Sequence, residues 1–479
     1  MKLFARDSAF YRKVFVLALP IALQSLITIG VNMLDTIMVG SLGDSALSAT
    51  SLANSFIGIY HIFCMGLGMG ASVLVSRYWG MKRAATDSAK AAEEMTPEAR
   101  KKSDEASIAL KQTVAMMLRI TLVLAALFAI VTFLMPGLLM KMYTNEEEII
   151  RLGSIYFEYS VVTYFFLGAS LVCTIVLRSV GQVRLPLMVS VGAFFVNLGA
   201  NYAFIFGKFG APKMGIAGAA LGTLIARVFE AVMICGYLFI KDECIRFRVR
   251  DMFMETGSLL GEYMRISIPV LISDGILAIG NNSVAMVIGR LGGAFTAANA
   301  ITSVTQQLST VVIQGVSQAG AIVTGMTLGE GDRDRTMKQG YLFFGLGLAL
   351  GTVSAVFILL ASGPIIAYYD NVSEETIRIA RQLMAAISLI IVFQGTNSIM
   401  TKGVLRGGGD TKMLMITDNI FLWVLAIPLG ILAGFVFKWS AFAIYICLKS
   451  DQIVKTVWAF LRLRSGKWIR KISTGRSAD

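Results

Sequence analysis

Long apolar stretches separated by shorter polar segments run along the whole chain. A helix that spans a bilayer takes about 20 residues, and the stretches reach that length. Helix is the expected structure, because lipid offers no partner to an unpaired backbone group. Twelve spans are predicted, near residues 14–39, 46–76, 113–136, 153–177, 186–206, 215–240, 266–289, 295–325, 340–363, 382–401, 413–436 and 440–461. The pattern therefore predicts an all-α integral membrane protein, with residues 14–39 as a first span rather than a cleaved signal.

The composition fits a chain that lies in lipid. It is 56% hydrophobic and 15% charged, whereas soluble globular domains are about 45–50% apolar and about 25% charged. The five cysteines form no C-x-x-C pair, and His61 is the only histidine. These counts exclude most soluble functions, a zinc or disulfide framework and an enzyme built on a histidine cluster.

The positive charges are distributed unevenly between the predicted loops. Lys and Arg number 43 against 30 Asp and Glu, an excess that would suggest a nucleic-acid partner for a soluble protein. If the N-terminus is cytoplasmic, the loops on that side carry 31 Lys and Arg, and the loops on the other side carry 8. Cytoplasmic loops are the ones enriched in these residues. We therefore expect the plasma (inner) membrane, both termini in the cytoplasm and no nucleic-acid partner.

The connection between the second and third spans is a long polar insertion. Residues 80–112 are rich in Ala, Lys and Glu, a composition that favours helix. We expect a helical extension on the cytoplasmic side. Charged runs of this kind are usually solvated surfaces, so no activity of its own is assigned to it.

The second half of the chain repeats the first. At an offset of 249 residues, the sequence superposes Pro20 on Pro269, Asn32 on Asn281, Gly40 on Gly289, Leu42 on Leu291, Gly43 on Gly292, Gly66 on Gly315 and Gly80 on Gly329. At an offset of 228 residues, it superposes Leu177, Arg178 and Gly181 on Leu405, Arg406 and Gly409. Two six-helix bundles are predicted, from residues 1–245 and 246–479. Each bundle has an even number of spans, so the two are parallel repeats.

Paired bundles of this kind serve alternating access in transporters. The sequence contains no G-x-x-x-x-G-K-[ST] motif, so ATP is not the expected driver. An ion gradient is the default energy source. We expect no cofactor apart from Na⁺ or H⁺ as the coupling ion.

Asp35 is the strongest candidate for ion coupling. A carboxylate at the centre of a membrane helix costs about 2.5–3.5 kcal/mol on insertion scales, so it is presumed functional. Asn32 and Gln24 extend a polar stripe from Asp35 along the same span. The alternative is a structural Asp near the outer interface that hydrogen-bonds to neighbouring backbone.

Three polar residues of the fifth and sixth spans could join Asp35. Asn197 and Asn201 lie four residues apart and so share one helix face. With Thr223 of the sixth span, their oxygens could complete the all-oxygen shell that hard cations such as Na⁺ prefer. The alternative is that these side chains only hydrogen-bond between helices.

Other candidates for a substrate cavity lie in the second half. Asp274 lies in the seventh span, and Asn281 follows it in the same span. Asp418 lies early in the eleventh span, where it could face the cavity or instead pair with Lys412 or Arg406.

Two further groups are defined by helical spacing. Gln307, Gln314 and Gln318 make a polar face on the eighth span, which could line a cavity or bond between helices. Arg227 and Glu230 lie three residues apart on the sixth span, and residues at this spacing are neighbours on a helix surface. We expect them to form a structural ion pair.

Four segments and their order are typical of one transporter family. They are DTIMVGSLG at the end of the first span, VLRSVGQVRLP and GVLRGGGDTK after the fourth and tenth spans, and N-x-x-x-N followed by FIFG in the fifth. The chain resembles, nearly end to end, the multidrug and toxic compound extrusion (MATE) family of ion-coupled exporters. The resemblance implies a V-shaped pair of bundles, alternating access, and antiport of cationic or amphipathic organic compounds against Na⁺ or H⁺. We expect the chain to act as a monomer.

The resemblance also implies roles for single residues. Asp35 falls where the family carries its first-half coupling aspartate, and Asn197 and Thr223 match residues of that site. Asn201 departs from the family, because many members carry Asp at its position.

The second half departs from the family as well. Leu277 and Gly395 stand where some members carry acids, which leaves open whether Asp274 takes their place. The long connection 80–112 is a further departure, since the family usually crosses there in far fewer residues.

Two other functions fit the sequence less well. A lipid-linked oligosaccharide flippase of the same superfamily needs a cationic cavity for phosphates, and only Arg119, Arg227, Lys449 and Lys455 are available in or near the spans. An integral-membrane enzyme needs a nucleophile, a base or a metal set, which one histidine and scattered acids do not provide. We expect no enzymatic activity, and the twofold repeat disfavours a passive channel.

Overall fold

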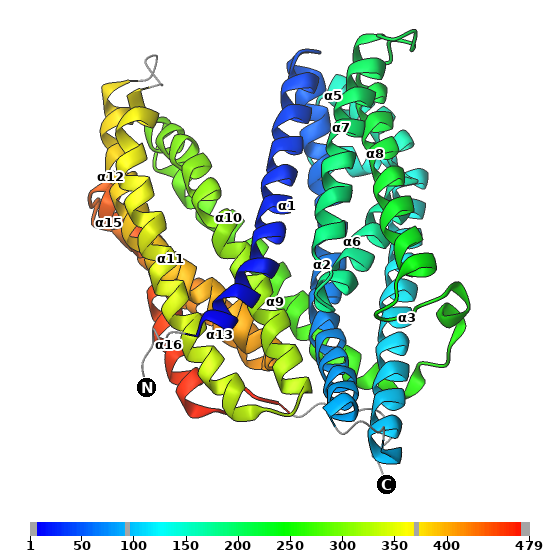
Figure 1. Ribbon diagram of the computed structural model, residues 1–479. Coiled ribbons are helices and arrows are strands. Elements are labelled where there is room, and N and C mark those ends of the chain that lie inside the picture. The colour runs from blue at the N-terminus through cyan, green and yellow to red at the C-terminus, as the bar shows by residue number, and fades with distance from the viewer. Residues whose placement is uncertain (1–6, 92–95, 368–372, 471–479) are drawn as a thin grey trace. The chain divides into compact units, whose positions relative to one another are not determined.

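The computed structural model describes residues 7–91, 96–367 and 373–470, and within them every regular element is a helix. Figure 1 shows the helices in chain order. The first half contains α1 (Ser8–Gly40), α2 (Asp44–Ala91), α3 (Pro97–Leu134), α4 (Pro136–Lys141), α5 (Glu147–Ser160), α6 (Thr163–Ser179), α7 (Arg184–Phe206), α8 (Ile216–Gly236), η1 (Tyr237–Lys241) and η2 (Val249–Phe253). The second half contains α9 (Gly257–Arg290), α10 (Gly293–Gly329), α11 (Arg333–Ala367), α12 (Glu374–Ser398), η3 (Ile399–Leu405), α13 (Thr411–Ile420), η4 (Phe421–Ala426), α14 (Ile427–Ile431), η5 (Leu432–Val436), α15 (Ala441–Leu448) and α16 (Ser450–Ser465).

The helices have the length and composition of membrane spans. Among the described residues, ten helical segments are long and apolar enough to cross a membrane. The pair α5 and α6, bent by 57°, makes an eleventh if the two helices count as one span. The predicted last span, 440–461, corresponds to α15 and α16, which contain 8 and 16 residues and meet at Lys449. The prediction of an all-α membrane fold is confirmed.

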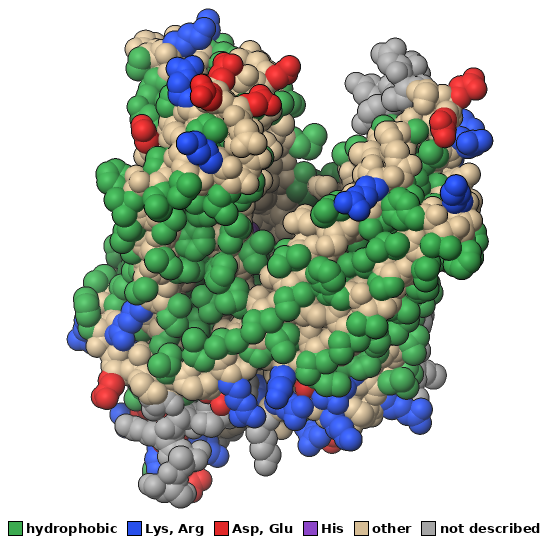
Figure 2. Space-filling model, turned by 180° about the vertical axis from the view of Figure 1, so that it is seen from behind, with side chains coloured by type: hydrophobic (Ala, Val, Ile, Leu, Met, Phe, Trp, Pro, Cys, Tyr) green, Lys and Arg blue, Asp and Glu red, His purple; other side chains and the backbone are tan. Residues whose placement is uncertain are grey.

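The outer faces of the helices are apolar. Val123, Phe133 and Leu360, for example, have exposed fractions of 71%, 69% and 75%. Figure 2 shows hydrophobic side chains covering most of the visible face, with most Lys and Arg toward the top and bottom of the view. Burial of apolar surface yields about 25 cal/mol per Å², and exposed apolar patches of this extent mark a surface that contacts a membrane.

Two pairs of glycines show the internal repeat in the backbone. Gly43 turns the chain from α1 into α2 with a φ of +110°, and Gly292 turns it from α9 into α10 with a φ of +117°. Gly181 and Gly409, which precede α7 and α13, have φ angles of +87° and +89°. Residues with a Cβ rarely adopt these angles. The two halves therefore repeat their turn geometry as well as their sequence.

The described residues pack into two compact units. The C-terminal unit contains those within Met1–Ala22, Arg83–Glu94 and Arg265–Ser473. The N-terminal unit contains those within Leu23–Lys82 and Met95–Met264. The two units therefore do not coincide with the two halves of the sequence, because the start of α1 and the end of α2 belong to the C-terminal unit.

Each unit has its own close-packed interior. In the N-terminal unit, the Tyr60 hydroxyl donates to the backbone carbonyl of Tyr164 at 2.9 Å, and their rings meet edge to face with centroids 5.1 Å apart. In the C-terminal unit, α11 and α12 lie side by side (Figure 1). A Cβ at Gly351 would lie only 2.7 Å from the Cα of Val392. Small residues of this kind allow membrane helices to approach closely.

The described part of the connection 80–112 is helical, as predicted. α2 continues to Ala91, and α3 begins at Pro97. The Thr96 side chain accepts a hydrogen bond from the backbone N–H of Ala99 at 3.3 Å, which caps the new helix. Proline is favoured at a first helical position because its φ is already helical. Residues 92–95 lie outside the described residues, and the cytoplasmic side stays a prediction.

The linker between the halves, residues 242–256, is fastened to α3. The guanidinium of Arg119 donates to the backbone carbonyls of Met252 and Met254, at 2.5 and 2.7 Å. A charged donor makes hydrogen bonds about twice as strong as a neutral one. The linker is therefore held by the N-terminal unit, and the predicted division of the chain between residues 245 and 246 stays a prediction.

An ion pair adds to this attachment. Lys111 Nζ donates to Asp251 Oδ2 at 2.8 Å. Burial opposes ionisation of Asp251, but the hydrogen bonds from Lys111 and from the backbone N–H of Arg248 outweigh it and hold the pKa of this carboxyl below its usual range. The ionised carboxylate consequently stabilises the linker above the unfolded-state pKa of about 3.9, and this contribution disappears as the pH falls through the folded-state pKa.

Lys111→Met is expected to loosen the linker. It is also expected to raise the pH at which acid begins to weaken the attachment of the linker. Without the ammonium, the pKa of Asp251 rises, so its stabilising contribution begins to disappear at a higher pH. The expected cost at neutral pH is about 1–2 kcal/mol. Limited proteolysis of residues 242–256 at several pH values measures both effects. Lys101→Met, on the exposed face of α3, is the control, and equal cleavage of the two variants would contradict the prediction.

Candidate functional site

Asp35 and two asparagines meet inside the N-terminal unit. Asn201 Nδ2 donates to Asp35 Oδ1 at 2.6 Å and to Asn197 Oδ1 at 3.3 Å. Both asparagines are buried and lie one turn apart on α7, as their spacing predicted. The structure therefore joins the carboxylate of the first span to the amide pair of α7.

Thr223 reaches the same cluster through a tyrosine. Tyr156, on α5, lies close to Thr223 of α8 and interacts electrostatically with Asp35. Its hydroxyl also donates to Asn54 Oδ1, on α2, at 3.3 Å. Tyr156 and Asn54 were not among the residues predicted from the sequence. Aromatic and amide residues occur throughout these spans, so no local pattern distinguishes them.

A buried oxygen in this cluster lacks a partner. Asn201 is 1% exposed, and its Oδ1 atom finds no hydrogen-bond partner among the described residues. Buried side-chain oxygens almost always have one. Together with the Asp35 carboxylate and Asn197 Oδ1, this atom supplies the uncharged and charged oxygens that a hard cation prefers.

Two charged residues of α8 lie near the cluster. Arg227 Nη1 donates to Glu230 Oε2 at 2.8 Å, so the predicted ion pair is present. Arg227 also acts electrostatically on Asp35 and on His61. Asp35 therefore has a fixed positive charge in its surroundings, which any ion bound there must compete with.

Gly222 allows α8 to pack against the cluster. A Cβ at this position would meet Asn201 Oδ1, and would lie 3.0 Å from the Asn201 backbone N and 3.1 Å from its Cγ. Both contacts are tighter than ordinary van der Waals packing. The lack of a side chain at Gly222 thus leaves the space that Asn201 occupies.

Gly222→Ala is expected to displace Asn201 from Asp35 and to weaken ion binding. Overpacking of a close contact costs about 1–3 kcal/mol, which corresponds to roughly a tenfold rise in the ion concentration that gives half-maximal transport. Gly236→Ala, in the same helix, is the control, since a Cβ there meets nothing within 4 Å. An identical ion dependence for the two variants would show that the packing at Gly222 is irrelevant to the site.

The rest of the predicted stripe on α1 does not join Asp35. Gln24 is buried, donates from Nε2 to Ser190 Oγ at 2.7 Å and accepts a hydrogen bond from Arg178. Asn32 is exposed. Among the described residues, no hydrogen bond links either of them to Asp35, so the cluster is centred on α7 and not on α1.

In the C-terminal unit, the acids pair differently from the sequence prediction. Asp418 was predicted to pair with Lys412 or Arg406 if it did not face a cavity. It lies instead 3.6 Å from Lys455, on α16. Arg406 pairs with Asp274 at 3.2 Å. Each of these acids therefore pairs with a cation from another helix, and Asp418 pairs with Lys455 and not with the cations expected from its place in the sequence.

The polar residues predicted for the eighth and seventh spans are largely exposed. Gln307, Gln314 and Asn281 are exposed, and Gln318 is half-buried. Gln306, also on α10, bonds across helices: it donates to Gln394 Oε1 at 2.9 Å and accepts from the Tyr445 hydroxyl at 3.2 Å. Gln306 was missed because it is adjacent in sequence to the predicted face and so lies about 100° away from it.

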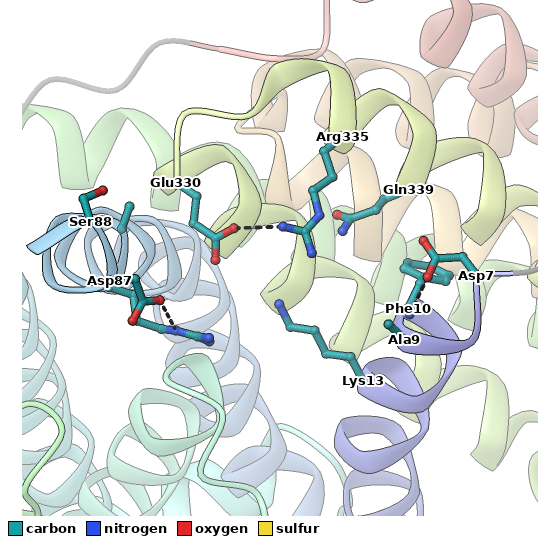
Figure 3. Close-up of a pocket in the computed structure, with 11 residues that line it drawn as sticks. Asp7, Ala9, Phe10, Lys13, Asp87, Ser88, Glu330, Arg335 and Gln339 are labelled. Carbon is teal, nitrogen blue, oxygen red and sulfur yellow. Dashed lines mark hydrogen bonds and ion pairs between the residues drawn. The ribbon is translucent and has the colours of Figure 1, made fainter. Parts of the chain in front are cut away.

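A charged pocket of about 630 Å³ lies in the C-terminal unit. Figure 3 shows its acidic and basic side chains, with Glu330 paired to Arg335 at 3.5 Å and Arg83 paired to Asp87 at 3.8 Å. Lys13 also lines the pocket. The two signs of charge are mixed, so the pocket presents no field that would select one kind of ion. None of the predicted site residues lines it.

Comparison with known proteins decides the family. The family model MatE matches residues 20–90, 106–203 and 269–432, more than half of the chain. The chain belongs to the MatE family. The matched ranges contain Asp35, Asn197 and Asn201, whereas Thr223 and Lys455 lie outside them.

Relatives of this MatE protein are named as multidrug resistance proteins. The probable multidrug resistance protein NorM of Thermotoga maritima is 26% identical over 465 residues, which are 95% of this chain and 92% of the relative. The multidrug resistance protein NorM of Burkholderia vietnamiensis is 25% identical over 426 residues, which are 86% of this chain and 85% of the relative. With its apolar helices, this MatE protein is a multi-pass membrane transporter.

Solved structures share the fold of this MatE protein. The Vibrio cholerae MATE transporter VcmN in its bent form matches with a TM-score of 0.82 at 17% identity, covering 97% of this chain and 99% of the other. The outward-facing structure of a multidrug resistance MATE family transporter matches with a TM-score of 0.80 at 18% identity, again covering 97% and 99%. These matches confirm the MATE-like helical fold.

Proposed function

We propose that this protein is an ion-coupled antiporter that exports cationic or amphipathic organic compounds by alternating access. The observation that carries the proposal is the carboxylate of Asp35 inside the first span, held by Asn201, whose own buried carbonyl oxygen has no partner among the described residues. A carboxylate is expensive to keep in a membrane helix unless function requires it.

The coupling ion is Na⁺ or H⁺. Sodium would bind the carboxylate of Asp35, the amide oxygens of Asn197 and Asn201 and the hydroxyl of Thr223, an all-oxygen set. A proton would neutralise Asp35 directly. Either ion removes the negative charge on binding and restores it on release, so the protein has two states that differ in charge. A ligand drives such a change only if it binds the two states differently.

The substrate is a small organic compound. The names of the relatives support this, because both NorM proteins are named for multidrug resistance. The carboxylate that the departing ion leaves behind favours an organic cation, since opposite charges attract strongly where the dielectric constant is low. The chain also contains 25 Met and 29 Phe, and soft, flexible apolar side chains adapt to varied ligands.

The protein acts as a monomer in the plasma (inner) membrane, with both termini in the cytoplasm. The distribution of Lys and Arg supports this orientation: with both termini inside, the cytoplasmic loops carry 31 of them and the loops on the other side carry 8. Positive loops are retained on the cytoplasmic side during insertion.

Dye transport in proteoliposomes tests the proposal. The purified protein is reconstituted, and a sodium gradient and a pH gradient are imposed separately while the membrane potential is held at zero. One of the gradients is expected to drive a fluorescent organic cation in the opposite direction. Dye movement that ignores both gradients would reject ion coupling, and a rate equal to that of empty liposomes would reject transport.

A further inference from the structure

A buried lysine of the C-terminal unit contacts two carboxylates. Lys455 Nζ, on α16, lies 2.9 Å from Asp451 Oδ2 and 3.6 Å from Asp418 Oδ1, on α13. All three side chains are buried. A lysine ammonium is a compact point charge with three N–H donors. One side chain therefore serves both carboxylates, which come from different helices.

Two amide side chains extend this group, which we call the lysine cluster: Asn397, Asp418, Asp451, Gln452 and Lys455. Gln452 Nε2 donates to Asp451 Oδ2 at 2.7 Å, and Asn397 Nδ2, on α12, donates to Gln452 Oε1 at 2.8 Å. Among the described residues, Asp451 Oδ1 and Asn397 Oδ1 find no hydrogen-bond partner. Buried oxygens nearly always have one, so the lysine cluster has acceptor capacity beyond what the ammonium uses.

Other charged side chains act electrostatically on the lysine cluster: Asp274, Lys402, Arg406 and Lys449. Arg406 and Asp274 pair with each other at 3.2 Å. Within the described part of the chain, Lys455 is the cation at ion-pair distance from Asp418 and from Asp451. Lys455 is thus the direct ionic partner that the two carboxylates share.

Stability alone does not account for the lysine cluster. Removing ions from water is costly, and buried ion pairs are often no more stabilising than apolar residues of the same volume. Removal of one partner is strongly destabilising, because it leaves a buried charge unpaired. Two carboxylates around one positive charge are, however, surroundings that a bound cation would have.

We propose that the ammonium of Lys455 takes the place of a bound cation in the C-terminal unit. It supplies, by a covalent link, the charge that Asp418 and Asp451 would otherwise take from solution. The C-terminal unit then binds no coupling ion, and exchange takes place at Asp35 alone. This inference rests on the proposed function, in which Asp35 is the exchanging group.

Removal of the ammonium tests this inference. Lys455→Met is made in a chain that already carries Asp35→Asn, so that the N-terminal site contributes no ion binding. Methionine retains much of the length and the apolar volume of the lysine stem. The two carboxylates then need a cation from solution, and bound radioactive sodium at about pH 8 is expected to rise from background to about one ion per chain. If the carboxylates take a proton instead, acid titration records about one extra proton per chain relative to the Asp35→Asn parent. Adding Asp451→Asn should remove the gain.

Two matched variants separate the ammonium from general charge effects. Lys449→Met removes a neighbouring cation that acts on Asp451 without being at ion-pair distance. It should leave sodium binding at background. Lys455→Arg keeps the charge and should do the same, whereas a purely structural lysine would give no sodium binding in any of the variants.

Two results would overturn the inference. The first is an Asp35→Asn chain that binds sodium and loses it on adding Asp451→Asn, because the C-terminal unit would then hold an ion beside Lys455. The second is a folded Lys455→Met chain that gains neither sodium nor a proton. The first measurement leaves Lys455 unchanged, so it decides the matter even if Lys455→Met does not fold. Failure of the proposed function would be seen separately, as gradient-driven transport that persists in the Asp35→Asn chain.

Discussion

Gradient-driven export by the Asp35→Asn variant is expected to fall to the level of empty liposomes, a loss of roughly 100-fold at least. The substituted amide has nearly the same shape as the carboxylate, and its oxygen can still accept the hydrogen bond that Asn201 donates at 2.6 Å. Packing of α1 against α7 is therefore preserved. The amide binds no proton at physiological pH and holds a cation far more weakly than a carboxylate does, so the gradient has no group to act on.

The matched control for Asp35→Asn is Asp44→Asn. Asp44 lies in the first turn of α2 and is exposed, so its loss changes the same net charge without touching the cluster. Transport under imposed sodium and pH gradients is measured for both variants, together with the thermal unfolding temperature in detergent. Normal transport by a well-folded Asp35→Asn chain would remove Asp35 from the mechanism.

Asn201→Asp is expected to strengthen sodium binding and the sodium dependence of transport. The new carboxylate would lie next to Asp35, at the position of an amide that now donates to it at 2.6 Å. Two adjacent negative charges repel each other and attract a shared cation. At an effective dielectric constant of about 20, one added charge at close range attracts a cation by up to about 4 kcal/mol. Screening by solvent and the repulsion between the two carboxylates reduce this gain. We expect about a tenfold fall in the sodium concentration for half-maximal transport.

Asn32→Asp provides the comparison for this second variant. Asn32 lies on the same helix as Asp35 but is exposed and outside the cluster. Titration of transport against sodium distinguishes the two variants. If Asn32→Asp produced the same change, the effect would be one of general negative charge, and the oxygen shell of Asn197, Asn201 and Thr223 would be disproved.

The helical fold could be predicted from the sequence because lipid permits few backbone structures. Residues 14–39 were predicted as a span, and α1 extends from Ser8 to Gly40. The break in the predicted span 153–177 was not predictable. It occurs at Val161 and Val162, between α5 and α6, which are bent by 57°. Neither residue is Pro or Gly, so no residue type at the break distinguishes it from the rest of the apolar stretch.

The candidate site was predictable only within single helices. The four-residue spacing of Asn197 and Asn201 requires a shared face, and the structure joins them by a hydrogen bond. Contacts between helices were less accessible. For Asp418 the sequence left two possibilities open, a place facing the cavity or a pair with Lys412 or Arg406, whereas its partner, Lys455, comes from another helix. Spacing along one helix cannot reveal such a partner, because the match depends on which faces two distant segments present to each other.

The glycines with matching positive φ angles at the turns bear on how the two halves evolved. Gly43 and Gly292, and likewise Gly181 and Gly409, keep nearly equal backbone angles in the two halves, as expected for descendants of one duplicated gene. A side chain at any of these turns would be strained in either copy, so both copies were held to the same residue. The ionisable side chains were under no such shared restraint, and after duplication each copy was free to specialise.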